Sequence, residues 1–174
     1  LIAKVFPPLR FSINLSIVQF QAEDFIVDFT DVIEKSGVEP QYIELEITES
    51  LYSENPRVTL DAIYKLKELG VSIAIDDFGR GYSTLNRVKL VPFDRLKIDK
   101  EIIDTIDVDK KLAPLTEIII LLARAMGASV TAEGVERKKQ ADFLKSIACD
   151  EIQGFYFSKP LSPEALEEFL GNET

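Results

Sequence analysis

The sequence contains no histidine and no tryptophan, and only one cysteine among its 174 residues. Without histidine, the chain cannot form a serine–histidine triad, a histidine-rich zinc site or an imidazole acid–base pair. The single cysteine, Cys149, excludes an intramolecular disulfide and is consistent with a reducing compartment. Chemistry must therefore use carboxylates, lysine, metal-bound water or the lone thiol, and any metal should be a hard ion such as Mg²⁺, Mn²⁺ or Ca²⁺.

Long apolar runs and an excess of basic residues are also missing. No apolar run approaches the roughly 18 residues needed to cross a bilayer, and the chain begins without a secretory signal. The net charge of −10 disfavours binding to a nucleic acid polymer, so an anionic ligand would require local positive charge. We therefore expect one cytoplasmic domain over residues 1–174 with no membrane contact. Because the first residue is Leu1, we expect it to be a piece of a longer polypeptide.

Strand and helix patterns alternate along the whole chain. Apolar alternation, glycine stops and helix-capping residues predict six strands, over 10–15, 42–48, 71–76, 94–98, 128–133 and 149–154. They also predict helices over 23–36, 55–70, 83–90, 114–126 and 137–147, with a last helix starting at 162. Such alternation predicts an α/β fold with a parallel sheet, either open or closed as a barrel. A dinucleotide-binding glycine fingerprint is absent, which weakens the open nucleotide fold.

The most informative segment is the strand that runs into Asp76 and Asp77 and is followed by Gly79-Arg80-Gly81. Two adjacent carboxylates beside an apolar strand repel one another and require a counter-charge. A divalent metal would supply it, and the glycines would allow a tight turn beside the metal. A solvated turn at the end of a strand is the alternative that this segment leaves open.

Similar polar residues end, or nearly end, each of the six predicted strands. In chain order these are Asn14, Glu46, Asp76 with Asp77, Lys97 with Asp99, Glu133, and Gln153. The carboxyl ends of parallel strands lie on one face of the sheet, which carries the active site in barrel enzymes. Individually, some have simpler explanations: Glu44, Glu46 and Glu49 could alternate toward solvent, Lys97 could lie on the surface, and Glu136 could pair with a basic neighbour.

Taken in order, these motifs resemble the EAL domain family of bacterial cyclic di-GMP phosphodiesterases. The matching segments are Ser-Ile-Asn-Leu-Ser around Asn14, Glu-Ile-Thr-Glu from Glu46 to Glu49, Asp-Asp-Phe-Gly-Arg-Gly-Tyr-Ser from Asp76 to Ser83, Lys-Ile-Asp from Lys97, Ala-Glu-Gly-Val-Glu from Ala132 to Glu136, and Gln-Gly from Gln153. The resemblance implies a modified TIM barrel, with about six of its eight strands in this chain. It also implies two Mg²⁺ or Mn²⁺ ions and hydrolysis of cyclic di-GMP to the linear dinucleotide pGpG.

The resemblance also implies roles for individual residues. The metal ligands would be Asn14, Glu46, Asp76, Asp77 and Glu133. Glu133 would also be the general base, with Lys97 at the attacking water and Gln153 at a catalytic water. Glu49 would anchor a loop that contacts substrate and a second subunit and includes Phe78, Gly79, Arg80, Gly81 and Ser83. Asp99 and Glu136 are candidates for an outer layer around the site.

Two departures from the family pattern affect these expectations. Arg80 stands where the family usually has threonine, and the Glu-Ala-Leu signature, with its metal-binding glutamate, does not occur in the chain. The expected domain is therefore incomplete at its N-terminal side and could be attached to sensory domains. Besides a phosphodiesterase that forms a homodimer, the sequence leaves open a cyclic di-GMP receptor or protein-interaction module without activity, and an unrelated Mg²⁺-dependent barrel enzyme.

Overall fold

The computed structural model describes residues 9–48, 56–80, 90–109 and 112–172. Six strands form one sheet in the order β1-β2-β3-β4-β5-β6, and every neighbouring pair is parallel. The elements in chain order are β1 (Phe11–Asn14), α1 (Ile17–Phe20), α2 (Phe25–Ser36), η2 (Pro40–Tyr42), β2 (Ile43–Thr48), α4 (Pro56–Glu68), β3 (Ser72–Phe78), β4 (Arg95–Ile98), α6 (Lys100–Ile103), α7 (Ala113–Ala125), β5 (Ser129–Ala132), α8 (Lys138–Ser146), β6 (Glu151–Ile152) and α9 (Pro163–Asn172).

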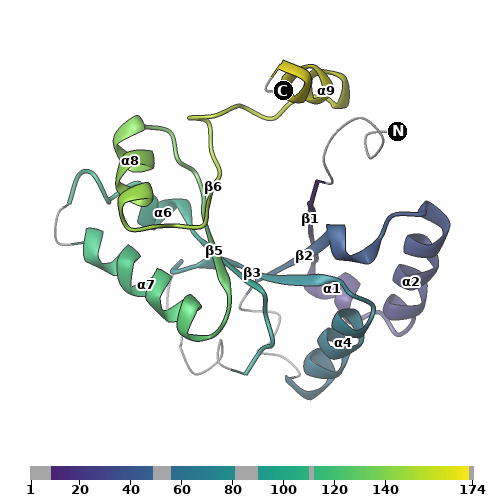
Figure 1. Cartoon of the computed structure of the whole chain (residues 1–174). Coiled ribbons are helices and arrows are strands. Elements are labelled where there is room, and N and C mark those ends of the chain that lie inside the picture. The colour runs from purple at the N-terminus through teal and green to yellow at the C-terminus, as the bar shows by residue number, and fades with distance from the viewer. Residues whose placement is uncertain (1–8, 49–55, 81–89, 110–111, 173–174) are drawn as a thin grey trace.

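The sheet curls into half of a barrel, with helices α2, α4, α7 and α8 around its outer side and α9 apart from them (Figure 1). Helices α2, α4, α7 and α8 lie between successive parallel strands in the chain, and their place on that outer side allows the strand order to follow the chain order. This architecture is a partial TIM barrel and confirms the predicted fold class.

The two faces of the sheet differ in polarity. Leu45, Ile73, Leu96 and Val130 belong to the buried hydrophobic core, which covers the outer face under the helices. Successive side chains of a strand point to opposite faces, so the residues between these core positions face inward. Those inward residues are mostly polar or charged. The apolar contacts that hold the sheet to its helices thus leave the concave face free for polar chemistry.

The element boundaries differ from the sequence prediction in a few places. The long helix begins at Ala113, as the proline at position 114 predicts, but two single-turn helices, α1 and α6, were not predicted. Strand β3 continues to Phe78, beyond its expected end at residue 76, and β6 has only two residues. The predicted helix over 83–90 lies almost wholly outside the described residues.

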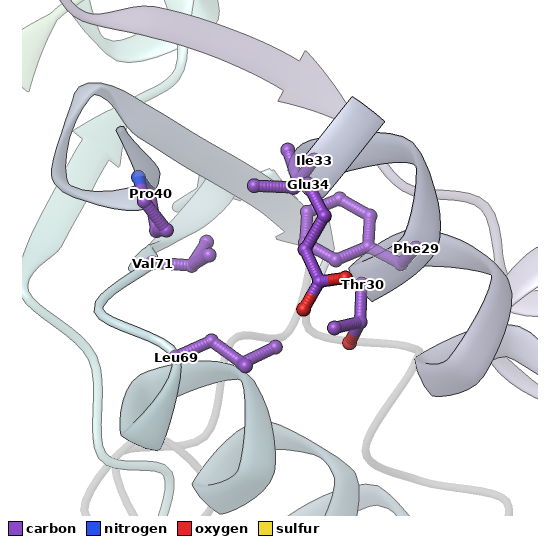
Figure 2. A pocket seen from close by; sticks show the side chains of 7 residues that line it. All are labelled: Phe29, Thr30, Ile33, Glu34, Pro40, Leu69 and Val71. Atoms are coloured by element: carbon purple, nitrogen blue, oxygen red, sulfur yellow. The ribbon is translucent and has the colours of Figure 1, made fainter. Parts of the chain in front are cut away.

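A small pocket of about 130 Å³ lies on the outer side of the sheet, between α2 and the α4–β3 connection (Figure 2). Its walls are largely apolar and include Phe29, Ile33 and Leu69. It therefore belongs to the packing of the outer layer and not to the polar concave face. No helix in the part of the chain that the structure describes has the length and apolarity needed to cross a bilayer.

Gly154 allows the segment after β6 to lie against the segment after β5. The Val135 amide donates to the Gln153 carbonyl oxygen at 3.0 Å, and the Tyr156 amide donates to the Val135 carbonyl oxygen at 2.9 Å. A Cβ on Gly154 would come within 2.2 Å of the Val135 carbonyl oxygen and 2.3 Å of its nitrogen. A side chain at this position must therefore separate the two segments.

We predict that Gly154→Ala lowers the free energy of unfolding by about 2–4 kcal/mol, as backbone clashes at packed positions do. Urea unfolding monitored by circular dichroism measures this change. The matched control is Gly171→Ala on α9, where a Cβ meets no atom within 4 Å. That change should be neutral or stabilising by up to about 1 kcal/mol. Equal effects at the two positions would contradict the packing role of Gly154.

Candidate active site at the carboxyl ends of the strands

Lys97 lies at the centre of an acidic cluster on the concave face. Its Nζ atom is 2.6 Å from Glu46 Oε1, 2.6 Å from Glu133 Oε1 and 3.5 Å from Asp76 Oδ1. Glu46 lies on the inward face of β2, Asp76 ends the inward series of β3, and Glu133 directly follows β5. Lys97 is only 4% exposed and Glu46 only 7%. Both residues therefore face the interior, and the solvent-facing alternatives for them are wrong.

The electrostatics of this cluster follow from burial and close pairing. Burial opposes the charge of Lys97, but hydrogen bonds to Glu133 and Glu46 outweigh it and raise the pKa of the ammonium above its usual value. Burial raises the pKa of Glu133, although Lys97 acts in the opposite direction. Lys97 therefore stays protonated at neutral pH, and Glu133 holds a proton more readily than an exposed glutamate.

A bulge at the end of β3 redirects Asp77. The register with β4 shifts between Ile75 and Phe78, and Asp77 adopts a left-handed backbone with φ of 54°. Its amide donates to Asp76 Oδ1 at 2.9 Å. Burial, the neighbouring Asp76 charge and a hydrogen bond with Asp99 raise the pKa of Asp77. The bulge thus keeps both adjacent carboxylates near the mouth of the half-barrel.

Asp77 also lies close to Arg80 and Asp99. Arg80 Nη1 lies 3.8 Å from Asp77 Oδ2, and Arg80 Nε lies 3.7 Å from Glu101 Oε1. Asp99 caps α6 by accepting the Glu101 amide at 2.6 Å. The two adjacent carboxylates therefore have two protein counter-charges, Lys97 for Asp76 and the exposed Arg80 for Asp77.

The segment that carries Glu133 is fastened to α6. The Glu133 amide donates to the Ile98 carbonyl oxygen at 3.1 Å. Glu136 does not pair with its basic neighbours in sequence, as the simpler alternative had it, but with Lys100, whose Nζ lies 2.9 Å from Glu136 Oε1. Gly134, with φ of 67°, accommodates Lys100, because a Cβ there would lie 2.4 Å from the lysine Cγ.

The two ends of the sheet contribute more exposed groups. Asn14 is exposed at the end of β1, in register with Glu46. Gln153 is also exposed and lines an open pocket of about 330 Å³ beside Thr131, Glu151 and Phe157. The structure therefore groups Glu46, Asp76, Lys97 and Glu133 tightly, and places Asn14 and Gln153 at the two sides of the group.

Not every expected loop residue can be placed. Glu49, Gly81 and Ser83 lie outside the described residues. Phe78 was expected in the substrate loop, but it is the last residue of β3 and is buried in the core. Gly79, with φ of 98°, packs against Ile102, where a Cβ would come within 2.1 Å of the isoleucine Cδ1. The packing of Gly79 against Ile102 therefore holds the first residue of the loop in place.

The donor atoms suit a hard divalent cation, since they are carboxylate and amide oxygens. Within the described ranges, however, no three acidic side chains are grouped closely enough to hold a metal ion. Lys97 supplies one positive counter-charge at the place where the sequence predicts a metal. The residues therefore fit a divalent cation by their chemistry, in a cluster whose charge one ammonium offsets in part.

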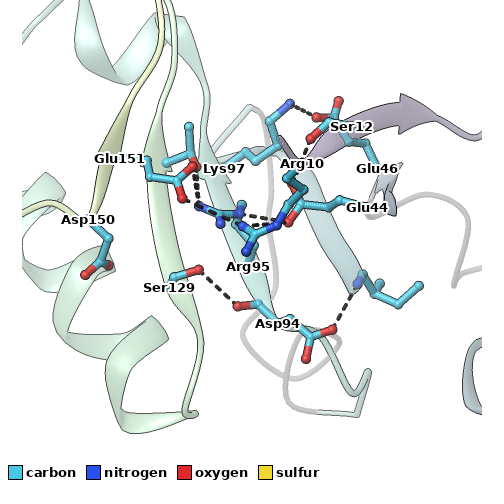
Figure 3. Close-up of polar contacts among 12 residues, drawn as sticks. Arg10, Ser12, Glu44, Glu46, Asp94, Arg95, Lys97, Ser129, Asp150 and Glu151 are labelled. Atoms are coloured by element: carbon cyan, nitrogen blue, oxygen red, sulfur yellow. Dashed lines mark hydrogen bonds and ion pairs between the residues drawn. The ribbon is translucent and has the colours of Figure 1, made fainter. Parts of the chain in front are cut away.

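One buried charged residue of this region was missed by sequence reasoning. Arg95 is 4% exposed and pairs with Glu44, whose Oε2 lies 2.8 Å from Arg95 Nε (Figure 3). Glu44 is buried as well, so it does not alternate toward solvent. The signal was present, because Arg95 precedes Lys97 by two residues and Glu44 precedes Glu46 by two, which places each pair on one face.

Known proteins are similar to this chain in sequence and in fold. The model of the EAL domain matches residues 1–160. The chain is 41% identical over 162 residues to the signaling protein YkoW of Bacillus subtilis, covering 93% of this chain and 20% of YkoW. It is 36% identical over 162 residues to the cyclic di-GMP phosphodiesterase NbdA of Pseudomonas aeruginosa, covering 93% of this chain and 21% of NbdA. The chain thus spans about a fifth of the length of these relatives.

Solved structures give the same result. The chain superimposes on the PaMucR phosphodiesterase in complex with c-di-GMP with a TM-score of 0.84 and 34% identity, covering 90% of this chain and 64% of that one. The EAL domain of Mycobacterium smegmatis DcpA gives 0.89 and 34%, covering 94% and 73%. Klebsiella pneumoniae BlrP1 with manganese and cyclic di-GMP gives 0.82 and 27%, covering 88% and 40%. With the family model matching most of its length, this chain belongs to the EAL domain family.

Proposed function

We propose that this chain is the phosphodiesterase part of a bacterial signalling protein and hydrolyses cyclic di-GMP to linear pGpG with divalent cations. The observation that carries the proposal is the contact of Lys97 with Glu46, Asp76 and Glu133 at the ends of neighbouring strands. Relatives and structural neighbours that are named as phosphodiesterases or were solved with cyclic di-GMP support it. A barrel places such residues where different strands can contribute different catalytic groups.

The proposal assigns two Mg²⁺ or Mn²⁺ ions to the oxygens of Asn14, Glu46, Asp76, Asp77 and Glu133. Such ions would neutralise the phosphodiester and lower the pKa of a bound water. A manganese-containing structure of an EAL neighbour supports a divalent metal. The acidic chain itself provides little positive charge, with a net charge of −10, so metal ions would reverse the local field for an anionic substrate.

Two side chains have different roles in the proposed reaction: Lys97 supplies positive charge, and Glu133 transfers a proton. Lys97 remains protonated, so its ammonium can hold the attacking water or a phosphate oxygen but cannot act as a base. Glu133, with its raised pKa, is the residue that takes the proton from water. The water oxygen bonds to phosphorus, one phosphorus–oxygen ester bond breaks, and the leaving ribose oxygen takes up a proton. Gln153 holds the water from the side of β6.

A receptor that binds cyclic di-GMP without cleaving it is the second candidate. Lys97 already contacts three carboxylates and supplies part of their counter-charge, and no acidic triad within the described residues is grouped as a metal site. The ammonium therefore takes over part of the role that a metal would have in this cluster. Binding of cyclic di-GMP that needs no divalent cation and yields no pGpG would favour this candidate over the enzyme.

We further propose that the protein is cytoplasmic, since the proposed substrate is an intracellular messenger. We also propose that it forms a homodimer through α7. Leu115, Ile118 and Leu121 form an exposed apolar stripe on α7, and Ile118 is 60% exposed. Glu117 and Arg124 flank the stripe with opposite charges. A two-fold axis can pack such a stripe against its own copy, because a symmetric interface uses the same surface twice.

Glu133→Gln should lower kcat for cyclic di-GMP hydrolysis by about 100-fold to 10,000-fold, because the variant cannot accept the proton from water. Chromatography of pGpG formed with Mg²⁺ or Mn²⁺ measures the effect. The control is Glu68→Gln, the same change on the exposed side of α4, which should keep wild-type activity. Full activity of Glu133→Gln would exclude this glutamate as the base.

Metal affinity should fall on acidification at a higher pH than ordinary carboxylates predict. Because the pKa values of Asp77 and Glu133 are raised, both begin to protonate sooner as the pH falls, and protons then compete with the cation. Calorimetric titration with Mn²⁺ between about pH 7.5 and 4.5 tests this. In Glu133→Gln the dependence on pH should be shallower. Affinity that stays constant down to about pH 4.5 would contradict the expectation.

Ile118→Asp should weaken dimerisation at least about 10-fold, because it places a charge in the centre of the apolar stripe. Light scattering after size-exclusion chromatography at several concentrations gives the oligomeric state. Val58→Asp introduces the same charge at an exposed apolar position of α4 and should leave the dimer intact. Dissociation by both variants, or by neither, would argue against a dimer through α7.

A further inference from the structure

A second layer of polar side chains lies beneath the proposed site. We call it the polar floor, and it consists of Ser12, Glu44, Arg95, Thr131 and Glu151. Each member precedes a residue of the proposed site by two positions, and that residue lies on the same strand or directly after its end; the five site residues are Asn14, Glu46, Lys97, Glu133 and Gln153. Since side chains two residues apart in a strand share a face, the floor repeats the site one layer deeper in the half-barrel.

Arg95 connects the strands of this floor (Figure 3). Its Nε atom is 2.8 Å from Glu44 Oε2, and its Nη1 atom is 2.7 Å from Glu151 Oε2. The same Nη1 donates to Thr131 Oγ1 at 2.9 Å, and Ser12 Oγ donates to Glu44 Oε1 at 2.8 Å. The planar guanidinium thus joins β4 to β2, β5 and β6 through fixed directions that a lysine cannot reproduce.

The contact between Arg95 and Glu44 crosses the intervening strand β3. On β3, Ser72 is in register with Glu44, and Ala74, which is fully buried, is in register with both Glu46 and Arg95. The contact between Lys97 and Glu46 crosses β3 in the same way one layer above, at 2.6 Å. Two stacked ion pairs therefore connect β2 to β4. The small side chain of Ala74 on β3 leaves enough space for these contacts to cross the strand.

We propose that Arg95 is a positioning residue of the site: its fork fixes the lateral spacing of β2, β4, β5 and β6 and thereby places Glu46, Lys97 and Glu133. This inference rests on the proposed function for its effect on hydrolysis. Stability alone does not require such a group, because buried ion pairs can often be replaced by apolar residues without loss of stability. The apolar core on the outer face already holds the sheet to its helices.

Arg95→Lys tests the inference, because it keeps the charge and removes the fork. We expect kcat for cyclic di-GMP to fall about 10-fold to 100-fold, as for residues that orient metal ligands, with KM within about threefold of wild type. The affinity for Mn²⁺, measured by calorimetry, should weaken about 10-fold. Arg124→Lys is the matched control, since Arg124 on α7 is more exposed and pairs with Asp150 away from the site. It should leave all three quantities unchanged.

Urea unfolding separates positioning from folding. If Arg95→Lys loses stability while kcat and Mn²⁺ affinity per folded molecule stay at wild-type values, Arg95 is merely structural and the inference is wrong. Should Arg95→Lys not fold, Glu151→Gln removes the charge of one partner of the fork at a side chain that is 55% exposed, and it should lower kcat and Mn²⁺ affinity by a smaller factor. If the wild-type protein yields no pGpG, the proposed function fails, and Mn²⁺ affinity alone decides the role of Arg95: unchanged affinity in folded Arg95→Lys overturns it.

Discussion

The structure depends on the contact of one buried ammonium with three carboxylates. Glu46, Asp76 and Glu133 would repel one another on the concave face if Lys97 did not lie between them. Burying a charge is costly unless it is paired, and here each charge has a partner within hydrogen-bond or ion-pair distance. The cluster therefore holds several acids close together before any cation or substrate binds. A cation that entered would compete with Lys97 for the same oxygens.

The half-barrel has its apolar core on the outer face of the sheet and its proposed catalytic residues on the inner face. In many barrels the interior is filled by branched apolar side chains. Here the inward positions of β2 and β4 carry Glu44, Glu46, Arg95 and Lys97, and the outward positions carry the core. Since apolar burial on the outer side supplies the main driving force for folding, the inner side can hold charged residues in fixed places.

Much of this could be predicted from the sequence, because strand ends in a parallel sheet must share one face. That rule brought Glu46, Asp76, Lys97 and Glu133 together correctly. It does not say which acid meets which cation, so the direct contact of Lys97 with Asp76 was not predicted. The pairing of Arg95 with Glu44 was not predicted for a related reason. It joins strands that are not adjacent, and local periodicity does not specify contacts across an intervening strand.

Adjacent carboxylates present a geometric problem that the bulge in β3 resolves. In a regular strand, Asp76 would face the concave side and Asp77 would point into the apolar outer core. The shifted register and the left-handed backbone of Asp77 turn its side chain toward Asp99 and Arg80 instead. The left-handed region is uncommon for residues other than glycine, asparagine and aspartate. The left-handed backbone of Asp77 thus has a function that the paired sequence requires: without it, two neighbouring acids could not serve one site.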